Sequence, residues 1–289
     1  MIENWNEFKI INYELERLIE RTNTVPKVKN ALRHVIKAGG KRTRPIIVLL
    51  TAKLCGGSYG DVMDMALAIE LMHTASLVHD DIIDHGVMRR NVKALHVEYD
   101  VSLAILVGDW LISKSVELLS RYPNEIISDF ARTGIMMSEG EVLDVYSPYD
   151  VFTEDEYFRC IRFKTASLFA CGAKNSAMVV CDDEVAWSKM FDYGLNLGMA
   201  YQLVDDLLEY MNMYRDKTSK VESVTLPMIY ESRYGETTVD AILEIIEDYA
   251  KKSRDALKYF EDCEARRKLE YLIDYMTFEM LSQNKNLCI

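Results

Sequence analysis

Two long stretches of the chain contain no proline, the interval from Pro45 to Pro123 and the interval from Pro148 to Pro227. Because proline interrupts helix interiors, these stretches leave room for many unbroken helices. Apolar residues recur in them at i, i+3 and i+4, as in 62–77 and 193–204. Alternating strand patterns with tight Asn-Gly or Asp-Gly turns are absent. The sequence therefore predicts an all-α fold of roughly ten or more helices.

Breaks between the helices are expected where glycine or proline punctuates the chain. The candidate positions are Gly39-Gly40, Gly56-Gly57, Tyr122-Pro123, Ser147-Pro148 and Lys217-Thr218-Ser219. No repeat, linker or low-complexity tract divides the 289 residues. We therefore predict one domain over residues 1–289.

The overall charge argues against a nucleic-acid partner, because the chain has 34 Lys and Arg against 46 Asp and Glu, a net charge of −12. No apolar run approaches the ~20 residues of a membrane span, and the N-terminus does not look like a signal peptide. The six cysteines have no paired spacing, which is typical of free thiols in a reducing compartment. We expect a cytoplasmic protein with no membrane span. A local basic cluster could still hold a small anion.

Two acidic clusters of similar design lie 125 residues apart, His79-Asp80-Asp81-Ile82-Ile83-Asp84 and Gln202-Leu203-Val204-Asp205-Asp206-Leu207-Leu208-Glu209. Helical spacing places Asp80 and Asp84 one turn apart on one face, and Asp205 and Glu209 in the same relation. Oxygen-only ligands suit Mg²⁺ rather than zinc. The alternative is a pair of solvated acidic turns, but the apolar surroundings of both clusters make an exposed face less favoured. If the helices face each other, four or more carboxylates could hold several Mg²⁺ ions.

Three basic segments accompany these carboxylates: Gly39-Gly40-Lys41-Arg42-Thr43-Arg44-Pro45, Arg89-Arg90, and Arg162-Phe163-Lys164-Thr165-Ala166-Ser167. Arg and Lys are the usual ligands of phosphate oxygens, although each segment alone would more often be surface charge. Together with the carboxylates they indicate two anionic pockets, one reached through Mg²⁺ and one held by cations alone.

These segments resemble the trans-type isoprenyl diphosphate synthases, or polyprenyl synthetases. Their order and spacing match that family over residues 39–227, with further matches at 73–84, Gly108-Asp109-Trp110-Leu111, Glu139-Gly140-Glu141, Lys164-Thr165-Ala166-Ser167-Leu168-Phe169, Tyr201-Gln202 and Thr225-Leu226-Pro227. The resemblance implies an antiparallel helical bundle around a deep central cavity, usually a homodimer. It also implies a Mg²⁺-dependent transferase that joins isopentenyl diphosphate to an allylic diphosphate.

The resemblance further implies individual roles. Three Mg²⁺ ions would be held by residues of both clusters, namely Asp80, Asp84, Asp205, Asp206 and Glu209, with Asp81 in support. The allylic diphosphate would be contacted by Arg89, Lys164, Thr165 and Gln202. Isopentenyl diphosphate would be bound by Lys41, Arg44, His73 and Arg90. A lone histidine is more often a packed core residue, but His73 lies two helical turns before Asp80, which favours a place at the cavity. We expect His79 to be structural, and no sequence feature assigns a role to His34.

The sequence departs from the family pattern after the second cluster. Glu209 stands where Asp is usual, and Glu222-Ser223 occupy the position of a usual Gly-Lys pair in a shortened loop. Lys217 or Lys220 could replace that contact, and Asn91 replaces a common Gly. Because of these changes, a non-catalytic subunit that tunes a related synthase remains an alternative function. A third alternative is a terpene cyclase. Lys41, Arg44 and Arg90 argue against it, because a cyclase would not need an isopentenyl pocket.

Side-chain size upstream of the first cluster bears on product length. Ala75 and Ser76 are small where synthases of fifteen- or twenty-carbon products often carry an aromatic residue, so Met72 could form the tunnel floor. We expect a product of about C20 to C25 or longer, from a ~1.5 Å rise per helical residue, and expect Ala75→Phe to shorten it. The alternatives are a farnesyl diphosphate synthase, or a floor supplied by another helix or a partner subunit.

Overall fold

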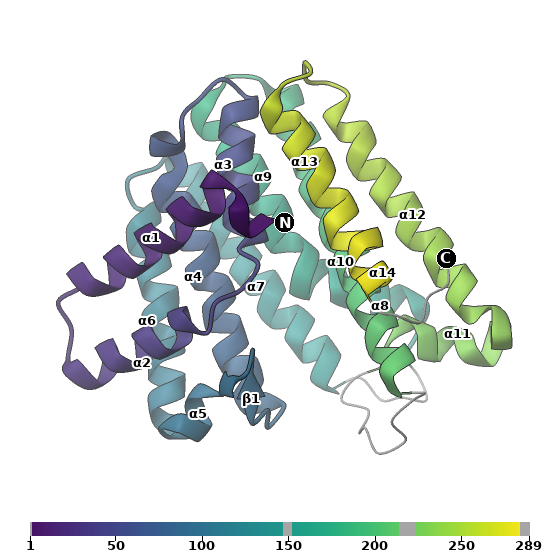
Figure 1. Ribbon diagram of the computed structural model, residues 1–289, viewed down its shortest axis with the longest axis horizontal. Helices are drawn as coiled ribbons and strands as arrows, with labels where there is room; N and C mark the ends of the chain where they lie inside the picture. The colour runs from purple at the N-terminus through teal and green to yellow at the C-terminus, as the bar shows by residue number, and fades with distance from the viewer. Residues whose placement is uncertain (1, 147–151, 214–223, 284–289) are drawn as a thin grey trace.

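The computed structural model describes residues 2–146, 152–213 and 224–283 (Figure 1). These ranges are almost entirely helical, and they confirm the all-α prediction with more than ten helices. The helices are η1 (Ile2–Asn4), α1 (Asn6–Arg21), α2 (Pro26–Lys37), α3 (Thr43–Leu54), α4 (Tyr59–Ile83), α5 (Leu95–Glu98), α6 (Val101–Leu119), α7 (Asn124–Tyr146), α8 (Glu154–Ile161), η2 (Arg162–Ala166), α9 (Ser167–Val180), α10 (Glu184–Met213), α11 (Leu226–Tyr234), η3 (Gly235–Thr237), α12 (Thr238–Leu257), α13 (Glu264–Asp274), η4 (Tyr275–Glu279) and α14 (Met280–Gln283).

The first three predicted breaks are confirmed. They fall between α2 and α3, between α3 and α4, and between α6 and α7. Gly39 and Gly40 have φ angles of 78° and 143°, which L side chains rarely adopt, so this pair ends the second helix. The breaks predicted at Ser147-Pro148 and at Lys217-Thr218-Ser219 lie outside the described residues.

A short β-hairpin follows α4, which the absence of a strand pattern did not predict. β1 (Met88–Arg89) pairs with β2 (Val92–Lys93) in antiparallel register, Met88 opposite Lys93 and Arg89 opposite Val92. The two-residue turn Arg90-Asn91 has φ angles of 49° and 66°. Positive φ at both central positions is the type I′ geometry of tight hairpins. Asn91 tolerates this backbone better than most residues, which explains how it replaces glycine.

α4 and α10, the two helices that carry the acidic clusters, are the centre of the packing. α4 packs against α3, α6 and α9, while α10 packs against α9 and α12, so α9 lies between the two (Figure 1). α4 buries residues around most of its circumference, including Val62, Ala66, Ile69 and Ala75, as expected for a central helix. The acidic turns at the ends of α4 and α10 are therefore held by rigid, buried helices. Within the three described ranges, no helix has the length and apolarity needed to cross a bilayer.

Candidate functional site

The first acidic cluster lies at the C-terminal end of α4. Burial raises the pKa of Asp80 to about 7, and the Glu141 carboxylate adds to the shift, partly offset by Lys164. Burial also raises the pKa of the more exposed Asp84. These carboxyl groups hold protons more tightly than free ones, chiefly because the protein removes their charged form from water. Such a site favours a bound cation.

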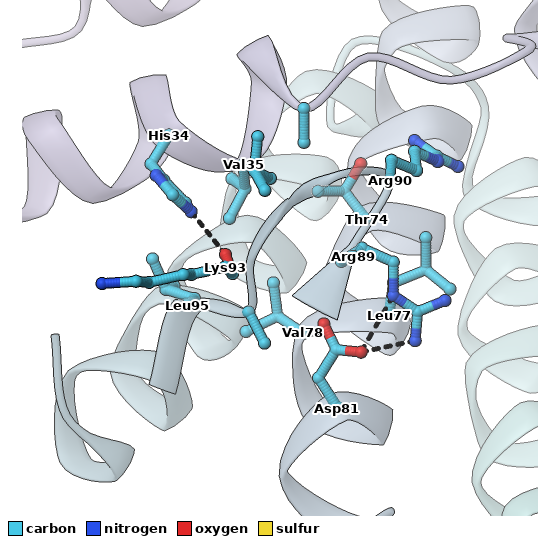
Figure 2. Close-up of a pocket in the computed structure, with 13 residues that line it drawn as sticks. His34, Val35, Thr74, Leu77, Val78, Asp81, Arg89, Arg90, Lys93 and Leu95 are labelled. Carbon is cyan, nitrogen blue, oxygen red and sulfur yellow. Dashed lines mark hydrogen bonds and ion pairs between the residues drawn. The ribbon is translucent and has the colours of Figure 1, made fainter. Parts of the chain in front are cut away.

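Asp81 is turned away from Asp80 and Asp84. It is buried, and its Oδ1 accepts hydrogen bonds from both Nε (2.9 Å) and Nη2 of Arg89 (Figure 2). Arg89 lies on β1, so this ion pair joins the hairpin to α4. Asp81 therefore orients the Arg89 side chain, in keeping with the supporting role expected for it.

Lys164 lies in η2, a π-helical turn between α8 and α9. π-Helical turns are rare and occur frequently at functional sites. The Lys164 Nζ contacts Asp144 (2.5 Å) and Glu141 (2.7 Å) on α7. Burial alone would lower the pKa of Lys164, but these two carboxylates override it and raise the pKa. A Cβ at Gly140 would collide with the Lys164 backbone, so glycine permits the close approach of α7 to η2.

Sequence reasoning assigned no role to Glu141 or Asp144. In the sequence, Glu141 belongs to the Glu139-Gly140-Glu141 match to the family, and Asp144 follows it by about one helical turn. The signal that could have found them was this i, i+3 pair of carboxylates directly after Gly140.

The second acidic cluster lies on α10, and its members differ in exposure. Asp206 is buried; its two oxygens accept hydrogen bonds from the Tyr157 hydroxyl and from Gln202 Nε2 (2.7 Å). Its pKa is raised to about 7 by burial. Both oxygens of Asp206 are thus engaged by protein donors, and its expected part in the metal site stays a prediction. Asp205 and Glu209 are exposed.

Gln202 and Thr165 form a single hydrogen-bonded unit. The Thr165 hydroxyl donates to Gln202 Oε1 (2.7 Å), while the amide nitrogen of Gln202 donates to Asp206. The structure thus links η2 to α10 through the two side chains that the sequence predicted to contact one diphosphate. Asp206 fixes the orientation of that amide.

The carboxylates of the two acidic clusters are candidate ligands for Mg²⁺. Among the residues described, no three His, Cys, Asp or Glu side chains converge as a ready-made metal cage. Mg²⁺ does not need one, because it usually keeps several waters and binds one or two carboxylates plus substrate phosphates. Asp80, Asp84 and Asp205 offer oxygen ligands only, and desolvation by the surrounding protein raises the pKa of each. The residues present therefore fit Mg²⁺ bound together with a phosphorylated ligand.

A cationic cavity of about 330 Å³ adjoins these helices. All four residues predicted to bind isopentenyl diphosphate line it together, with a tyrosine that the prediction left without a role: Lys41, Arg44, His73, Arg90 and Tyr201. The Lys41 Nζ lies 5.8 Å from the ring centres of Tyr201 and Tyr275 and 3.1 Å from Met280 Sδ. The two aromatic faces therefore help to hold the Lys41 ammonium at the cavity.

Arg44 and His73 form a pair in this cavity. The Arg44 guanidinium stacks 4.2 Å from the Phe169 ring centre, and its Nη1 lies 3.1 Å from His73 Nε2. Because guanidinium only donates, His73 Nε2 accepts. Burial, with Arg44 and other arginines nearby, holds the pKa of His73 well below its usual value, so the ring is neutral. The buried Arg44 Nε has no hydrogen-bond partner, which leaves a donor for a ligand.

Arg42, between two cavity residues in sequence, points into the protein. It forms a buried ion pair with Glu70 (2.6 Å), and the two side chains are only 2% and 3% exposed. It also donates to the carbonyl of Ile36 (3.0 Å). Its backbone is left-handed (φ 52°), and the paired Arg42 and Glu70 form part of the lining of the cavity that Lys41 and Arg44 also line. Arg42 thus supports the basic loop from inside.

His73 and His79, about two turns apart on α4, lie in different surroundings. His73 lines the cavity as predicted. His79 packs its ring against Gly108, where any Cβ would collide with it, and its Nε2 lies 3.3 Å from the Ile105 carbonyl. This contact between α4 and α6 agrees with the structural role expected for His79 and explains the glycine in the Gly108-Asp109 match.

The residues before the first acidic cluster differ in burial: Ala75 lies in the core, and Ser76 lies on the helix face of Asp80. Ala75 is fully buried, so an aromatic residue there would also crowd the core, and the product shortening expected of Ala75→Phe stays a prediction. Ser76 is half-buried and lies with Met72 and Asp80 on one face, at i, i+4 and i+8. A Cβ on Gly134 of α7 would lie 3.6 Å from Met72 Cε, so Met72 points towards α7.

Known proteins share both the sequence and the fold. The family model described as polyprenyl synthetase matches residues 25–263. A geranylfarnesyl diphosphate synthase from Methanosarcina mazei is 40% identical over 97% of this chain and 95% of its own length. An octaprenyl diphosphate synthase from Haemophilus influenzae is 32% identical, over 81% and 74%. Among solved structures, a geranyltranstransferase from Methanosarcina mazei superposes with a TM-score of 0.84 at 38% identity, covering 97% and 100% of the two chains. A polyprenyl synthase from Caulobacter crescentus, complexed with calcium and isoprenyl diphosphate, gives 0.83 at 30% identity over 93% and 94%.

Proposed function

This chain belongs to the polyprenyl synthetase family, and from that premise we propose that it joins isopentenyl diphosphate to an allylic diphosphate, head to tail, to give an all-trans prenyl diphosphate. The observation that carries this proposal is the presence of a basic cavity next to carboxylates of α4, α7 and α10. In the cavity, basic side chains outnumber acidic ones, whereas the carboxylates surround Lys164.

Isopentenyl diphosphate binds in the cationic cavity in this proposal. Lys41, Arg44 and Arg90 neutralise its diphosphate, and the free Nε of Arg44 donates one hydrogen bond. His73 stays neutral and orients Arg44. The cavity holds the second substrate without a metal ion.

The allylic diphosphate binds at the carboxylates. Asp80, Asp84 and Asp205, with Glu209 nearby on α10, would hold the Mg²⁺ ions, for which we propose three per site. When bound, Mg²⁺ neutralises the negative charge on the diphosphate leaving group. The calcium and isoprenyl diphosphate named for the Caulobacter relative support a hard cation in this kind of site. Arg89, Lys164, Thr165 and Gln202 contact the remaining diphosphate oxygens, with Arg89 oriented by Asp81 and Gln202 by Asp206.

The reaction breaks the allylic C–O bond and leaves a carbocation and a diphosphate. The double bond of isopentenyl diphosphate attacks the cation, a C–C bond forms, and a proton is lost to the released diphosphate. Cationic side chains stabilise the charge as it develops on the leaving group. Exclusion of water protects the carbocation from quenching. No side-chain nucleophile or dedicated base is required.

We propose a product of about C20 to C25, in keeping with the small side chain at Ser76 and the geranylfarnesyl name of the 40%-identical relative.

We further propose that the chain acts as one domain over residues 1–289, in the cytoplasm. Free thiols at Cys55, Cys160, Cys171, Cys181 and Cys263 suit a reducing compartment.

Ser76→Phe is expected to shorten the main product by one or more isoprene units. The half-buried Ser76 shares a helix face with Asp80, so a large ring there would block the growing chain. Chromatography of the dephosphorylated products measures the change, with Ser76→Val as a control of intermediate size. A product distribution in Ser76→Phe identical to that of the wild type would count against a floor on α4.

We also propose a homodimer formed through α6 and α7, which pack against each other. Both helices expose large apolar side chains: Leu106 and Ile135 are each 61% exposed, and Val142 is 57% exposed. Exposed apolar patches of this kind mark protein interfaces.

The double variant Ile135→Asp, Val142→Asp is expected to sediment as a monomer at concentrations where the wild type is a dimer. Tyr13→Asp, at a 64% exposed residue of α1, is the matched control. A double variant that still sediments as a dimer would remove this face from consideration.

The function is tested by product analysis of the purified protein with Mg²⁺, labelled isopentenyl diphosphate and, in turn, dimethylallyl, geranyl, farnesyl or geranylgeranyl diphosphate. A ladder of prenyl diphosphates is expected. A folded protein that elongates none of these starters would contradict the proposal and favour a tuning subunit.

A further inference from the structure

The β1–β2 hairpin is seated between α2 and α4 (Figure 2). A small pocket of about 30 Å³ remains between the hairpin and the two helices. On the helix side it is lined by His34 and Val35 of α2, by Ala38 just after α2, and by Thr74, Leu77 and Val78 of α4. The hairpin therefore touches both helices and presents Arg89 and Arg90 towards the two anion sites.

Each arginine has its own anchor. Arg89 is held by Asp81 on α4, as described above. Arg90 lines both this pocket and the cationic cavity, and its Nη1 donates to the carbonyl of Gly39, just after α2. A Cβ on Gly40 would collide with the Arg90 guanidinium, so the glycine pair makes room for it. The guanidinium position thus depends on how the hairpin sits against the end of α2.

His34 fixes the returning strand of the hairpin to α2. Its Nε2 lies 2.8 Å from the carbonyl oxygen of Lys93 on β2 (Figure 2). A carbonyl only accepts, so His34 Nε2 carries the hydrogen and donates. The ring also meets Tyr99 edge-on, with centroids 6.2 Å apart and an interplanar angle of 87°, which limits its rotation.

The hairpin is too short to absorb a shift of β2. Only Arg90 and Asn91 separate the strands, both in left-handed backbone, and the Ala94 amide closes the base by donating to the Val87 carbonyl (3.1 Å). A displacement at Lys93 therefore passes to Arg90 across the ladder. We propose that His34 is a positioning residue: its hydrogen bond to Lys93 holds Arg90 at the cationic cavity. This inference rests on the proposed function, in which Arg90 binds isopentenyl diphosphate.

Two substitutions separate the hydrogen bond from the shape of the ring. His34→Phe keeps a ring but loses the donor, whereas His34→Gln keeps an N–H donor. For His34→Phe we expect the KM for isopentenyl diphosphate to rise about fivefold, the effect of losing one ordinary hydrogen bond, with kcat changed by less than about twofold. His34→Gln should restore most of the wild-type KM. The KM for the allylic substrate should change less, because Asp81 anchors Arg89 independently.

Hydrogen exchange of the Ala94 amide provides a second measurement that needs no catalysis. It should be about fivefold faster in His34→Phe than in the wild type or His34→Gln, by the same reasoning. Two results would overturn the inference: wild-type exchange and KM in His34→Phe, or equal impairment of the Phe and Gln variants. A wild-type protein without prenyltransferase activity would instead refute the proposed function, while the exchange result would still report on the anchor.

Discussion

Asp80→Ala is expected to lower kcat by about 10²–10³-fold, the usual cost of losing one group that stabilises developing charge in a closed site. Asp80 lies where burial and the neighbouring Glu141 carboxylate raise its pKa to about 7, so the protein keeps its charge poorly compensated until a cation binds. Its loss should also raise the Mg²⁺ concentration needed for half-maximal activity. Steady-state rates at several Mg²⁺ concentrations measure both effects.

Asp182→Ala is the matched control, because this aspartate is exposed between α9 and α10, outside the proposed site. Its kcat and Mg²⁺ dependence should equal those of the wild type. Asp80→Ala with normal turnover would rule out a metal-binding role for this carboxylate. A tuning subunit would show no loss of its effect on a partner synthase.

Arg42→Met is expected to lower the free energy of unfolding by about 3–5 kcal/mol, because it leaves the Glu70 charge buried without its partner. Met roughly preserves the apolar stem of Arg42, so the loss reflects charge and hydrogen bonds more than volume. Urea unfolding followed by circular dichroism measures the change. Since Arg42 also shapes the loop of Lys41 and Arg44, the KM for isopentenyl diphosphate should rise in parallel.

Two further variants test the cause. Arg42→Met combined with Glu70→Leu should recover much of the lost stability, because the unpaired charge is then removed. Arg267→Ala breaks an exposed ion pair with Asp262 (2.9 Å, side chains 59% and 70% exposed) and should cost less than about 1 kcal/mol. Similar losses for Arg42→Met and Arg267→Ala would contradict a special role for the buried pair.

The helical architecture could be predicted because its signals are local. Apolar spacing and the scarcity of proline act within a few turns of chain, and they identified α4 and α10 and the breaks on either side of α3. The β1–β2 hairpin was not predicted, because its strands are only two residues long and its turn is Arg90-Asn91, whereas a glycine usually marks such a turn.

The sequence predicted which basic residues lie together, but it did not predict the contacts that hold them. Lys41, Arg44, His73 and Arg90 do line one cavity. Asp205 and Asp206 are neighbours in sequence, yet they face opposite environments, since successive residues point about 100° apart around a helix. The partners Glu141 and Asp144 come from α7 and carry little signal of their own.

The sequence by itself determined the fold class, the helices that bear the acidic clusters and the family, because these depend on residue type and spacing along the chain. Only the tertiary structure decided that Arg42 is buried against Glu70, that Tyr157 donates to Asp206, and that His34 reaches Lys93. Each of these contacts joins segments whose relative position is set by side-chain packing. Burial then changes the energetics of a charged or polar group by several kcal/mol, which no local pattern encodes.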